Sequence, residues 1–272
     1  MMPISRSTRA EAWLAASEVM HNSHRREYNV ILEVLEPGAA TATSRAIEHA
    51  VDDFLRCHDA QPTHTVAETI FPAIEYRRGG IEAVYEYPRT IYPFIKSLNA
   101  NSWGTYALRL AERTCTDGTI IKPLELAIKK LKRQLGTGSA KRAVYELDLG
   151  LDALELKLYS AEYDNNRPIG GQCLSHISLK LGQNKELYMT ALYRYQYFVQ
   201  KALGNLLGLA RLQAAIAREV GIPVGPLVCH ATMAILEDHQ LENSAKWNRD
   251  QVAALLSKCR AFVDAEPSGV AA

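Results

Sequence analysis

Cys173 and Arg194 are the two residues whose types and placement best suit chemistry. Cys173 opens an apolar, alternating, strand-like run, and Arg194 lies near the end of a second run of the same kind. A cysteine attacks electrophiles as its thiolate, and a neighbouring arginine favours that charged form. The guanidinium can also hold an anionic group of a substrate by paired hydrogen bonds. The pattern therefore predicts a nucleophilic thiol beside an arginine that binds an anion.

A structural role is the alternative for Cys173, because free cysteines commonly serve as small buried apolar residues. The chain has five cysteines, at positions 57, 115, 173, 229 and 259. Their number is odd and no CxxC spacing occurs, which argues against a disulfide framework and against a zinc site. We therefore expect a reducing, cytoplasmic location, no bound metal, and four cysteines that the chemistry does not need.

Composition narrows the partners that the protein could have. The 272 residues are 47% hydrophobic, which is enough for one large domain with a full core. A net charge of +1 gives no overall field that would recruit nucleic acid or an anionic membrane. The sequence has no run of eighteen apolar residues, so it predicts no membrane span. Its first thirty residues are polar and do not resemble a secretory signal. Lys201, at a predicted helix start, is interpreted as solvated.

Hydrophobic periodicity and turn residues divide the chain into helical and strand-like segments. Helices are expected over residues 6–21, 43–57, 65–78, 122–135, 201–220 and 248–263. Strands are expected over residues 27–35, 141–150, 173–181 and 185–196 and within 222–236. We expect Pro72 to kink the third helix, Gly79 and Gly80 to close it, and Gly221 to end the fifth. The pattern favours a single α+β domain over residues 1–272, with a mostly antiparallel or mixed sheet packed with helices.

A wider pattern joins Cys173 and Arg194 to Asn205. Asn205 follows the arginine by eleven residues and lies at the head of the long helix expected over 201–220. This order of cysteine, strand, arginine and helix-opening asparagine resembles the core of the thymidylate synthase family, which includes the hydroxymethylases of pyrimidine nucleotides. In that family a proline commonly precedes the cysteine, whereas Gln172 precedes it here.

Two upstream segments add to the resemblance. The segment LKRQLGTGSAKRAVYEL carries Lys141 and Arg142 where the family has a double arginine at a strand start. The segment AETIFP carries Glu68 where the family has a helix with a catalytic glutamate. The resemblance covers a family-like core over residues 65–263, after a divergent N-terminal part over residues 1–60. It implies a thymidylate-synthase-like fold and a homodimer joined through the sheet, with each site built from both chains.

The resemblance implies a role for each of these residues. The Cys173 thiolate adds to C6 of a pyrimidine, which makes C5 a nucleophile towards a one-carbon unit. A partly buried Glu68 serves as general acid–base through water, and Asn205 hydrogen-bonds the pyrimidine edge. The 5′-phosphate is expected to bind to Arg194, Lys141 and Arg142. Taken singly, the alternatives are a buried thiol, a helix-surface glutamate and a solvated basic pair.

Four positions depart from the family pattern. Tyr195 and Tyr197 stand where the family has a serine and the aspartate that orients folate. Ala234 and Leu236 stand near the His-x-Tyr that grips the 3′-hydroxyl of deoxyribose. Trp103, in the segment SWGTY, stands roughly where the family has a loop near the ligand. We therefore expect Tyr195 and Trp103 to contact substrate and Tyr197 to face the cofactor, and we expect a sugar preference unlike that of an ordinary thymidylate synthase.

The function expected from the resemblance is transfer of a one-carbon unit to C5 of a pyrimidine nucleoside 5′-monophosphate, with 5,10-methylenetetrahydrofolate as cofactor. Hydroxymethylation of the CMP, dCMP or UMP type is favoured, because the folate-side residues are altered and hydride transfer demands a stricter folate pose. Reductive methylation, as in thymidylate synthases, is the first alternative. A nucleotide-binding homodimer that has lost the chemistry is the alternative of another class.

Overall fold

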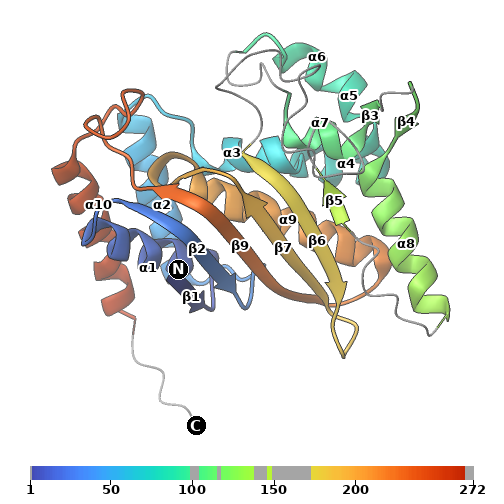
Figure 1. Ribbon diagram of the computed structural model, residues 1–272, viewed down its shortest axis with the longest axis horizontal. Coiled ribbons are helices and arrows are strands. Elements are labelled where there is room, and N and C mark those ends of the chain that lie inside the picture. Colours follow the sequence, from blue (N-terminus) through green and yellow to red (C-terminus); the bar gives the residue numbers. More distant parts are fainter. Residues whose placement is uncertain (1, 99–103, 115–117, 138–145, 149–172, 267–272) are drawn as a thin grey trace.

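The computed structural model of the chain describes residues 2–98, 104–114, 118–137, 146–148 and 173–266 (Figure 1). The predicted contacts of Trp103, Lys141 and Arg142 lie outside these residues. One seven-stranded sheet organises the described part, with strand order β1-β2-β9-β7-β6-β5 and with β8 paired to β9. Its strands are β1 (Met2–Arg6), β2 (Arg26–Val34), β5 (Glu146–Asp148), β6 (Leu174–Leu181), β7 (Leu187–Tyr193), β8 (Gln196–Tyr197) and β9 (Val224–Ile235).

The sheet is mixed. Strands β2 and β9, β6 and β7, and β5 and β6 pair antiparallel. Strands β1 and β2, β7 and β9, and β8 and β9 pair parallel. A second, two-stranded sheet pairs β3 (Arg113–Thr114) with β4 (Ile120–Ile121). The expected α+β class with a mixed sheet and helices is confirmed. The sequence predicted no strand at β1, and the helix expected over residues 6–21 begins at Arg9.

Helices account for most of the remaining described residues. They are α1 (Arg9–His21), α2 (Ala42–Cys57), α3 (Thr63–Ile70), α4 (Ala73–Tyr85), α5 (Tyr87–Thr90), α6 (Tyr92–Ile95), α7 (Tyr106–Ala111), α8 (Pro123–Thr137), α9 (Leu203–Val220) and α10 (Arg249–Asp264). A π-helix, η2 (Phe198–Ala202), runs directly into α9. None of the described helices combines the length and the apolar character that crossing a lipid bilayer requires.

Local sequence explains where several helices begin and end. Thr8 caps α1 and Asn248 caps α10, each in a reciprocal capping box with the residue three positions on. Gly221 ends α9 in the left-handed conformation, with φ of 79°. Pro72 separates α3 from α4, as expected. Gly79 and Gly80 have non-helical backbone angles, with φ of 66° at Gly80, so they end the first helical segment of α4, as expected, before a second segment runs to Tyr85.

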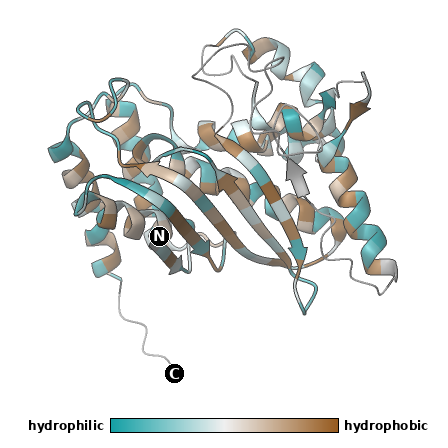
Figure 2. Ribbon diagram, viewed as in Figure 1, coloured by the Kyte–Doolittle hydropathy of each residue, from teal (hydrophilic) through white to brown (hydrophobic). Residues whose placement is uncertain are grey.

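The hydrophobic core lies between one face of the sheet and the helices that cover it. Helix α9 passes behind β9, β7 and β6 in Figure 1, and α1 packs against β1 and β2. Along β7 and β9, buried residues alternate with half-buried or exposed ones, because successive side chains point to opposite faces. Figure 2 shows this as apolar bands along the strands. On the other face Tyr188 and Thr190 are exposed.

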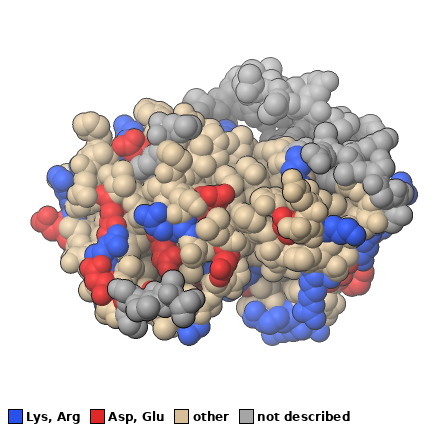
Figure 3. All heavy atoms as spheres, turned by 90° about the horizontal axis from the view of Figure 1, so that it is seen from below, with Lys and Arg blue, Asp and Glu red and all other residues tan. Residues whose placement is uncertain are grey.

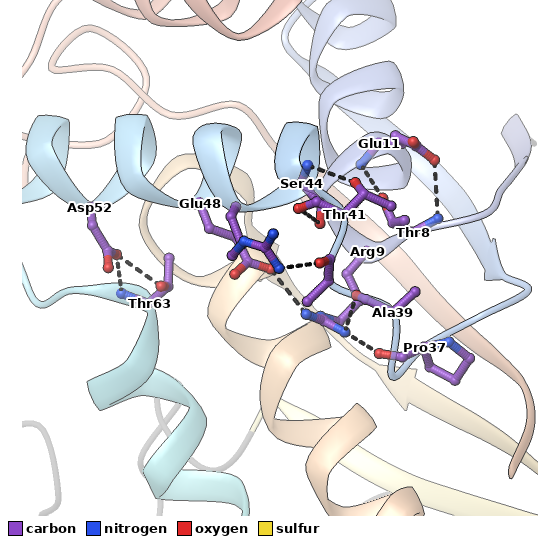
Figure 4. A network of polar contacts seen from close by, with 12 residues as sticks. Thr8, Arg9, Glu11, Pro37, Ala39, Thr41, Ser44, Glu48, Asp52 and Thr63 are labelled. Atoms are coloured by element: carbon purple, nitrogen blue, oxygen red, sulfur yellow. Dashed lines mark hydrogen bonds and ion pairs between the residues drawn. The ribbon is translucent and has the colours of Figure 1, made fainter. Parts of the chain in front are cut away.

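Helix α3 is held tightly against α9. Asp52 of α2 accepts hydrogen bonds from the backbone N–H and the hydroxyl of Thr63, both at 2.8 Å, which fixes the start of α3 (Figure 4). Gly204 and Gly208 then let the two helices approach closely. A Cβ at Gly204 would lie 2.6 Å from Val66 Cβ, and one at Gly208 would lie 2.9 Å from the Ala67 carbonyl oxygen. Glycines four residues apart thus place the first turns of α9 directly on α3.

The N-terminal part is joined to this layer by buried polar contacts. Arg9 of α1 is buried and pairs with Glu48 of α2 at 3.1 Å, and it also donates to the carbonyl oxygens of Pro37 and Ala39 (Figure 4). A buried guanidinium needs several acceptors to offset its desolvation, and this one has them.

Acidic and basic side chains are interspersed over much of the face seen in Figure 3.

Candidate functional site

The β6–β7 hairpin places Cys173 opposite Arg194. Its turn is closed by the N–H of Gly182, which donates to the Glu186 carbonyl at 2.8 Å, and this fixes the pairing register of the two strands. At the other end of the hairpin, the N–H of Arg194 donates to the carbonyl oxygen of Cys173 at 2.8 Å. The juxtaposition predicted from the sequence is therefore present. The catalytic role of the pair stays a prediction.

A β-bulge lies next to Cys173. The register shifts between Leu174 and His176, and the hydroxyl of Ser175 donates to the carbonyl oxygen of Leu192 at 3.0 Å. Bulges at the end of a strand re-aim side chains and are frequent beside active sites. Cys173 itself is half-buried, immediately before the first residue of β6.

Two cations act on the thiol. Burial raises the pKa of Cys173, and the positive charges of Arg194 and Lys201 partly oppose that rise. Because the raised direction prevails, the ligand-free protein holds Cys173 mainly as the neutral thiol at neutral pH. The sequence-based expectation of a thiolate favoured by arginine is therefore incomplete, since burial outweighs the two cations.

Aromatic residues from two elements surround the same position. The N–H of Leu174 donates to the hydroxyl oxygen of Tyr106 at 3.1 Å, which links α7 to the start of β6. The rings of Tyr195 and Tyr197 meet edge to face, 5.0 Å apart, and the Tyr197 hydroxyl donates to Glu242 at 3.2 Å. Burial raises the pKa of Tyr106 to about 12, and the charge of Cys173 adds to the effect. These hydroxyls therefore stay neutral near pH 7.

The π-helix that follows these tyrosines is anchored by a buried carboxylate. Glu237, only 2% exposed, accepts hydrogen bonds from the backbone N–H groups of Val199 at 3.1 Å and Gln200 at 2.7 Å. Such N–H groups at the beginning of a helix have no partner within the helix itself. Burial raises the pKa of Glu237 to about 7, although the hydrogen bonds from the backbone oppose this.

Lys201 lies in this anchored π-helix and is not the solvated lysine that the sequence suggested. Its side chain is half-buried. Burial lowers the pKa of Lys201, while the charges of Glu237 and Cys173 raise it. One feature of the sequence could have marked Lys201 as a residue near the site. It lies inside the eleven-residue interval between Arg194 and Asn205. Its burial depends on η2, which periodicity did not reveal.

Asn205 lies one turn further along, in the first turn of α9. It is 6% exposed, and its amide makes no hydrogen bond to another residue in the part of the chain that the structure describes. A buried amide normally has partners for its donors and acceptor. Asn205 therefore has hydrogen-bonding capacity that a ligand could use, which suits the expected role at a pyrimidine edge.

Glu68 is not in direct contact with Cys173. Its carboxylate pairs with Arg211 of α9 at 3.1 Å and accepts a hydrogen bond from the Ile74 N–H at 3.3 Å. Within the described residues, no hydrogen bond or ion pair joins it to Cys173. The charge of Glu68 reaches Tyr87, whose pKa is raised mainly by burial. The hydroxyl of Thr105 donates to that of Tyr87 at 3.3 Å.

The described residues form no continuous hydrogen-bonded path from Glu68 to the thiol. Glu68 acts on Tyr87 through its charge, and no described hydrogen bond joins the two. Thr105 is followed by Tyr106, whose hydroxyl oxygen accepts the Leu174 N–H. A general acid–base role of Glu68 at the thiol would therefore need a bridging group.

Ala234 and Leu236 are part of the core. They are 0% and 1% exposed, respectively, so neither can hydrogen-bond or contact a sugar from this position. Among the described residues, no three His, Cys, Asp or Glu side chains are grouped as metal ligands would be. No protein-family model matches the chain, and no curated protein is similar enough in sequence to count as a relative. The family resemblance therefore rests on the residues and geometry described above.

Proposed function

We propose that the protein transfers a one-carbon unit to C5 of a pyrimidine nucleoside 5′-monophosphate, by hydroxymethylation, as a member of the thymidylate synthase family. The observation that carries this proposal is the backbone hydrogen bond between Arg194 and Cys173 at 2.8 Å, with Asn205 at the head of the adjoining helix. The bond brings the backbones of the thiol and guanidinium residues together, and Asn205 follows Arg194 by eleven residues, in the first turn of α9. A cytoplasmic location fits the free thiols of Cys57, Cys173, Cys229 and Cys259.

The chemistry divides among the residues as follows. The Cys173 thiolate attacks C6, the C5–C6 double bond opens, and the electron pair is held as an enolate or enamine at C5. Arg194 binds the phosphate and so fixes the ring relative to the sulfur atom. Asn205 donates to and accepts from the ring edge. After C5 has bonded to the one-carbon unit, its proton passes to water, the electron pair left on C5 re-forms the C5–C6 double bond, and the S–C6 bond breaks to regenerate the thiolate.

The residues beside the thiol fit a reduced folate, although they differ from the family pattern. Tyr195 and Tyr197 offer half-buried aromatic rings, and Glu242 offers a carboxylate to the Tyr197 hydroxyl. A pterin can stack on such rings and donate N–H groups to a carboxylate. When bound, 5,10-methylenetetrahydrofolate supplies the one-carbon unit. Because the orienting aspartate is absent, we favour hydroxymethylation, which needs no hydride transfer, over the reductive methylation of thymidylate synthases.

The test is release of tritium from C5 of labelled CMP, dCMP, UMP and dUMP, each with and without 5,10-methylenetetrahydrofolate. We expect release from at least one nucleotide, and a hydroxymethyl rather than a methyl product by mass spectrometry. Release from none of the four would overturn the proposal. A methyl product would instead support the thymidylate synthase reaction.

The variant Cys173→Ala gives the matched control for the nucleophile. It should bind nucleotide but reduce tritium release to background, since no other group supplies the sulfur that attacks C6. Cys57→Ser removes an exposed thiol elsewhere and should retain full release. Wild-type release by the Cys173→Ala variant would show that the nucleophile lies elsewhere.

We further propose that the active form is a homodimer joined through the face of the sheet opposite α1 and α9. In register across that face lie half-buried side chains from four strands, Ile31, His230, Leu192 and His176. Such a mixed apolar and polar row is suited to burial against a second copy of itself about a two-fold axis.

A second candidate function is nucleotide binding without chemistry. Two observations favour it: the pKa of Cys173 is raised, and the Glu68 carboxylate is engaged by Arg211 rather than facing the thiol. Calorimetric binding of a nucleotide together with no tritium release from any of the four would support this candidate.

A further inference from the structure

The chain between Arg194 and Asn205 is fixed at both ends. The carbonyl oxygen of Arg194 accepts a hydrogen bond from the hydroxyl of Thr232 in β9 at 2.8 Å. Gly204, immediately before Asn205, lies so close to α3 that a Cβ there would be 2.7 Å from the carbonyl oxygen of Thr63. The two proposed substrate ligands are therefore tied to different elements, and the residues between them set how the two are arranged.

The connection between these two residues passes through β8 and η2. Strand β8 ends at Tyr197, which pairs with Ile235 of β9, and η2 begins at the next residue. A π-turn takes up one residue more than an α-turn, so it rotates the residues that follow by about 100° around the helix axis. The direction in which Asn205 points from the first turn of α9 therefore depends on η2 keeping its form.

A buried carboxylate holds the first turn of η2. Glu237 lies two residues beyond Ile235 and is 2% exposed. Its Oε2 accepts a hydrogen bond from the Val199 N–H at 3.1 Å, and its Oε1 accepts one from the Gln200 N–H at 2.7 Å. The strand that pairs with β8 thus also leads into the side chain that receives two N–H groups of η2.

Two tryptophans complete this anchor. The indole N–H of Trp13 donates to the carbonyl oxygen of Phe198 at 2.8 Å, and that of Trp247 donates to the carbonyl oxygen of Glu237 at 2.6 Å. All four residues are buried. Because water does not reach these groups, losing a partner would leave a buried donor or acceptor unsatisfied. The start of η2 is therefore held by contacts that solvent does not replace.

We propose that Glu237 is a positioning residue of the nucleotide site. Through the backbone of η2 it sets the place of Asn205 relative to Arg194, and so the spacing between the base ligand and the phosphate ligand. The inference rests on the proposed function, because it takes these two residues as ligands of one nucleotide. A ligand that contacts both loses affinity when their spacing changes, whereas a ligand that contacts Arg194 alone does not.

The test compares a nucleotide with inorganic phosphate. Isothermal titration calorimetry measures the affinities for CMP, dCMP, UMP and dUMP, and a phosphorus NMR titration measures the affinity for inorganic phosphate. Glu237→Ala releases both N–H groups of η2, so it should weaken the tightest-binding nucleotide by roughly tenfold. Phosphate affinity should stay within about twofold, because Arg194 keeps its own backbone contacts. General unfolding would weaken both ligands equally.

Glu237→Gln separates the hydrogen bonds from the charge. Glu237 also faces the ammonium of Lys201, and its charge raises the pKa of that group. The glutamine has the same reach and keeps one acceptor oxygen, but it carries no charge. We therefore expect its nucleotide affinity within about threefold of the wild type. A Glu237→Gln variant as weak as Glu237→Ala would overturn the inference, because charge rather than the held backbone would then be responsible.

Thr41→Ala is the matched control for lost stability. It removes the side-chain cap of α2, an oxygen that accepts from the Ser44 N–H at 3.0 Å, and lowers stability without touching η2. Its nucleotide affinity should stay within about twofold of the wild type. A Glu237→Ala variant that binds nucleotide as tightly as Thr41→Ala would overturn the inference.

Trp13→Phe provides the same test if Glu237→Ala does not fold. It removes the donor to the Phe198 carbonyl oxygen and keeps an aromatic ring in the core. It should weaken nucleotide binding by roughly threefold or more and leave phosphate binding unchanged. Equal nucleotide affinities of Trp13→Phe and the wild type would then overturn the inference.

Failure of this inference is distinguishable from failure of the proposed function. Tritium release together with unchanged nucleotide affinity in Glu237→Ala would keep the enzyme assignment and remove the role of Glu237. Selective loss of nucleotide affinity without tritium release from any nucleotide would keep the role of Glu237 and remove the one-carbon transfer. A wild-type protein that binds none of the four nucleotides would overturn both.

Discussion

At the scale of single residues, burial decides the properties of the candidate site. The same apolar surroundings raise the pKa of the Cys173 thiol and lower that of the Lys201 ammonium. Both shifts favour the neutral forms. The charges of Arg194 and Lys201 oppose the shift of the thiol, and the charge of Glu237 opposes that of the ammonium.

Sugar selection is the first property to test at this scale. Ala234 and Leu236 are buried apolar residues and cannot grip a 3′-hydroxyl. We therefore expect a ribonucleotide to bind at least as tightly as its deoxy counterpart. Isothermal titration calorimetry of the Cys173→Ala variant with each pair of nucleotides measures this. A preference for the deoxy form by tenfold, about 1.4 kcal/mol, would contradict the expectation.

Glu237 predicts a dependence of stability on pH. Its pKa is raised from 4.5 in the unfolded chain to about 7 in the folded protein. Between these values the folded state holds a proton that the unfolded state has lost. The contribution of Glu237 to the free energy of unfolding is therefore full below pH 4.5, falls as the pH rises towards 7, and is constant above it.

Glu237→Gln removes this titration while keeping an acceptor for the N–H groups of Val199 and Gln200. The free energy of unfolding of the variant should gain on that of the wild type between pH 5 and pH 8, by up to about 3 kcal/mol. Urea unfolding of both proteins at four pH values across that range gives the difference. If the free energies of unfolding of the two proteins differ by the same amount at all four pH values, Glu237 does not titrate in this window.

At the scale of elements, the contact between α3 and α9 positions both Glu68 and Asn205. The contact depends on glycines, since the backbones of the two helices approach where Gly204 and Gly208 face α3. A Cβ at Gly204 would also lie 2.7 Å from the carbonyl oxygen of Thr63, which is backbone and cannot rotate away. The two helices would have to move apart.

Gly204→Ala should therefore destabilise the protein by about 1–3 kcal/mol, even though alanine favours a helix more than glycine does. It should also reduce nucleotide affinity, because Asn205 is the next residue. Gly38→Ala is the matched control: a Cβ there meets nothing within 4 Å, so stability should change by less than about 0.5 kcal/mol. Equal urea midpoints for the two variants would show that α3 and α9 tolerate separation.

At the scale of the whole molecule, the sheet face opposite α1 and α9 and the family resemblance together predict a dimer with shared sites. If Arg142 reaches the partner's phosphate, an Arg142→Ala chain spoils the neighbouring site and a Cys173→Ala chain spoils its own. Mixing the two inactive variants under conditions of chain exchange should restore about a quarter of wild-type activity, since half of the dimers are mixed and each has one intact site.

Native mass spectrometry establishes the exchange, and tritium release measures the recovery. A mixture that exchanges chains but stays as inactive as its parents would place the phosphate site within one chain. A protein that stays monomeric at assay concentration while releasing tritium would exclude the shared-site arrangement altogether.

The sequence by itself determined the features that depend on nearby residues. Gly221 ends α9, Pro72 separates α3 from α4, and alternation of apolar residues identifies β7 and β9. These features are local, because capping, proline geometry and strand pleating act over a few residues. The pairing of Cys173 with Arg194 belongs to the same class. A hairpin register follows from its turn and from counting along two adjacent strands.

The tertiary structure alone decided which distant residues meet. Glu237 follows β9 yet holds the start of η2, and Arg211 takes the Glu68 carboxylate from a helix 143 positions away. The parallel pairing of β7 with β9, and of β1 with β2, likewise joins segments far apart in the chain. Such contacts depend on the closure of long loops and on burial, which no local pattern encodes. For the same reason the half-buried environment of Lys201 became visible only in the fold.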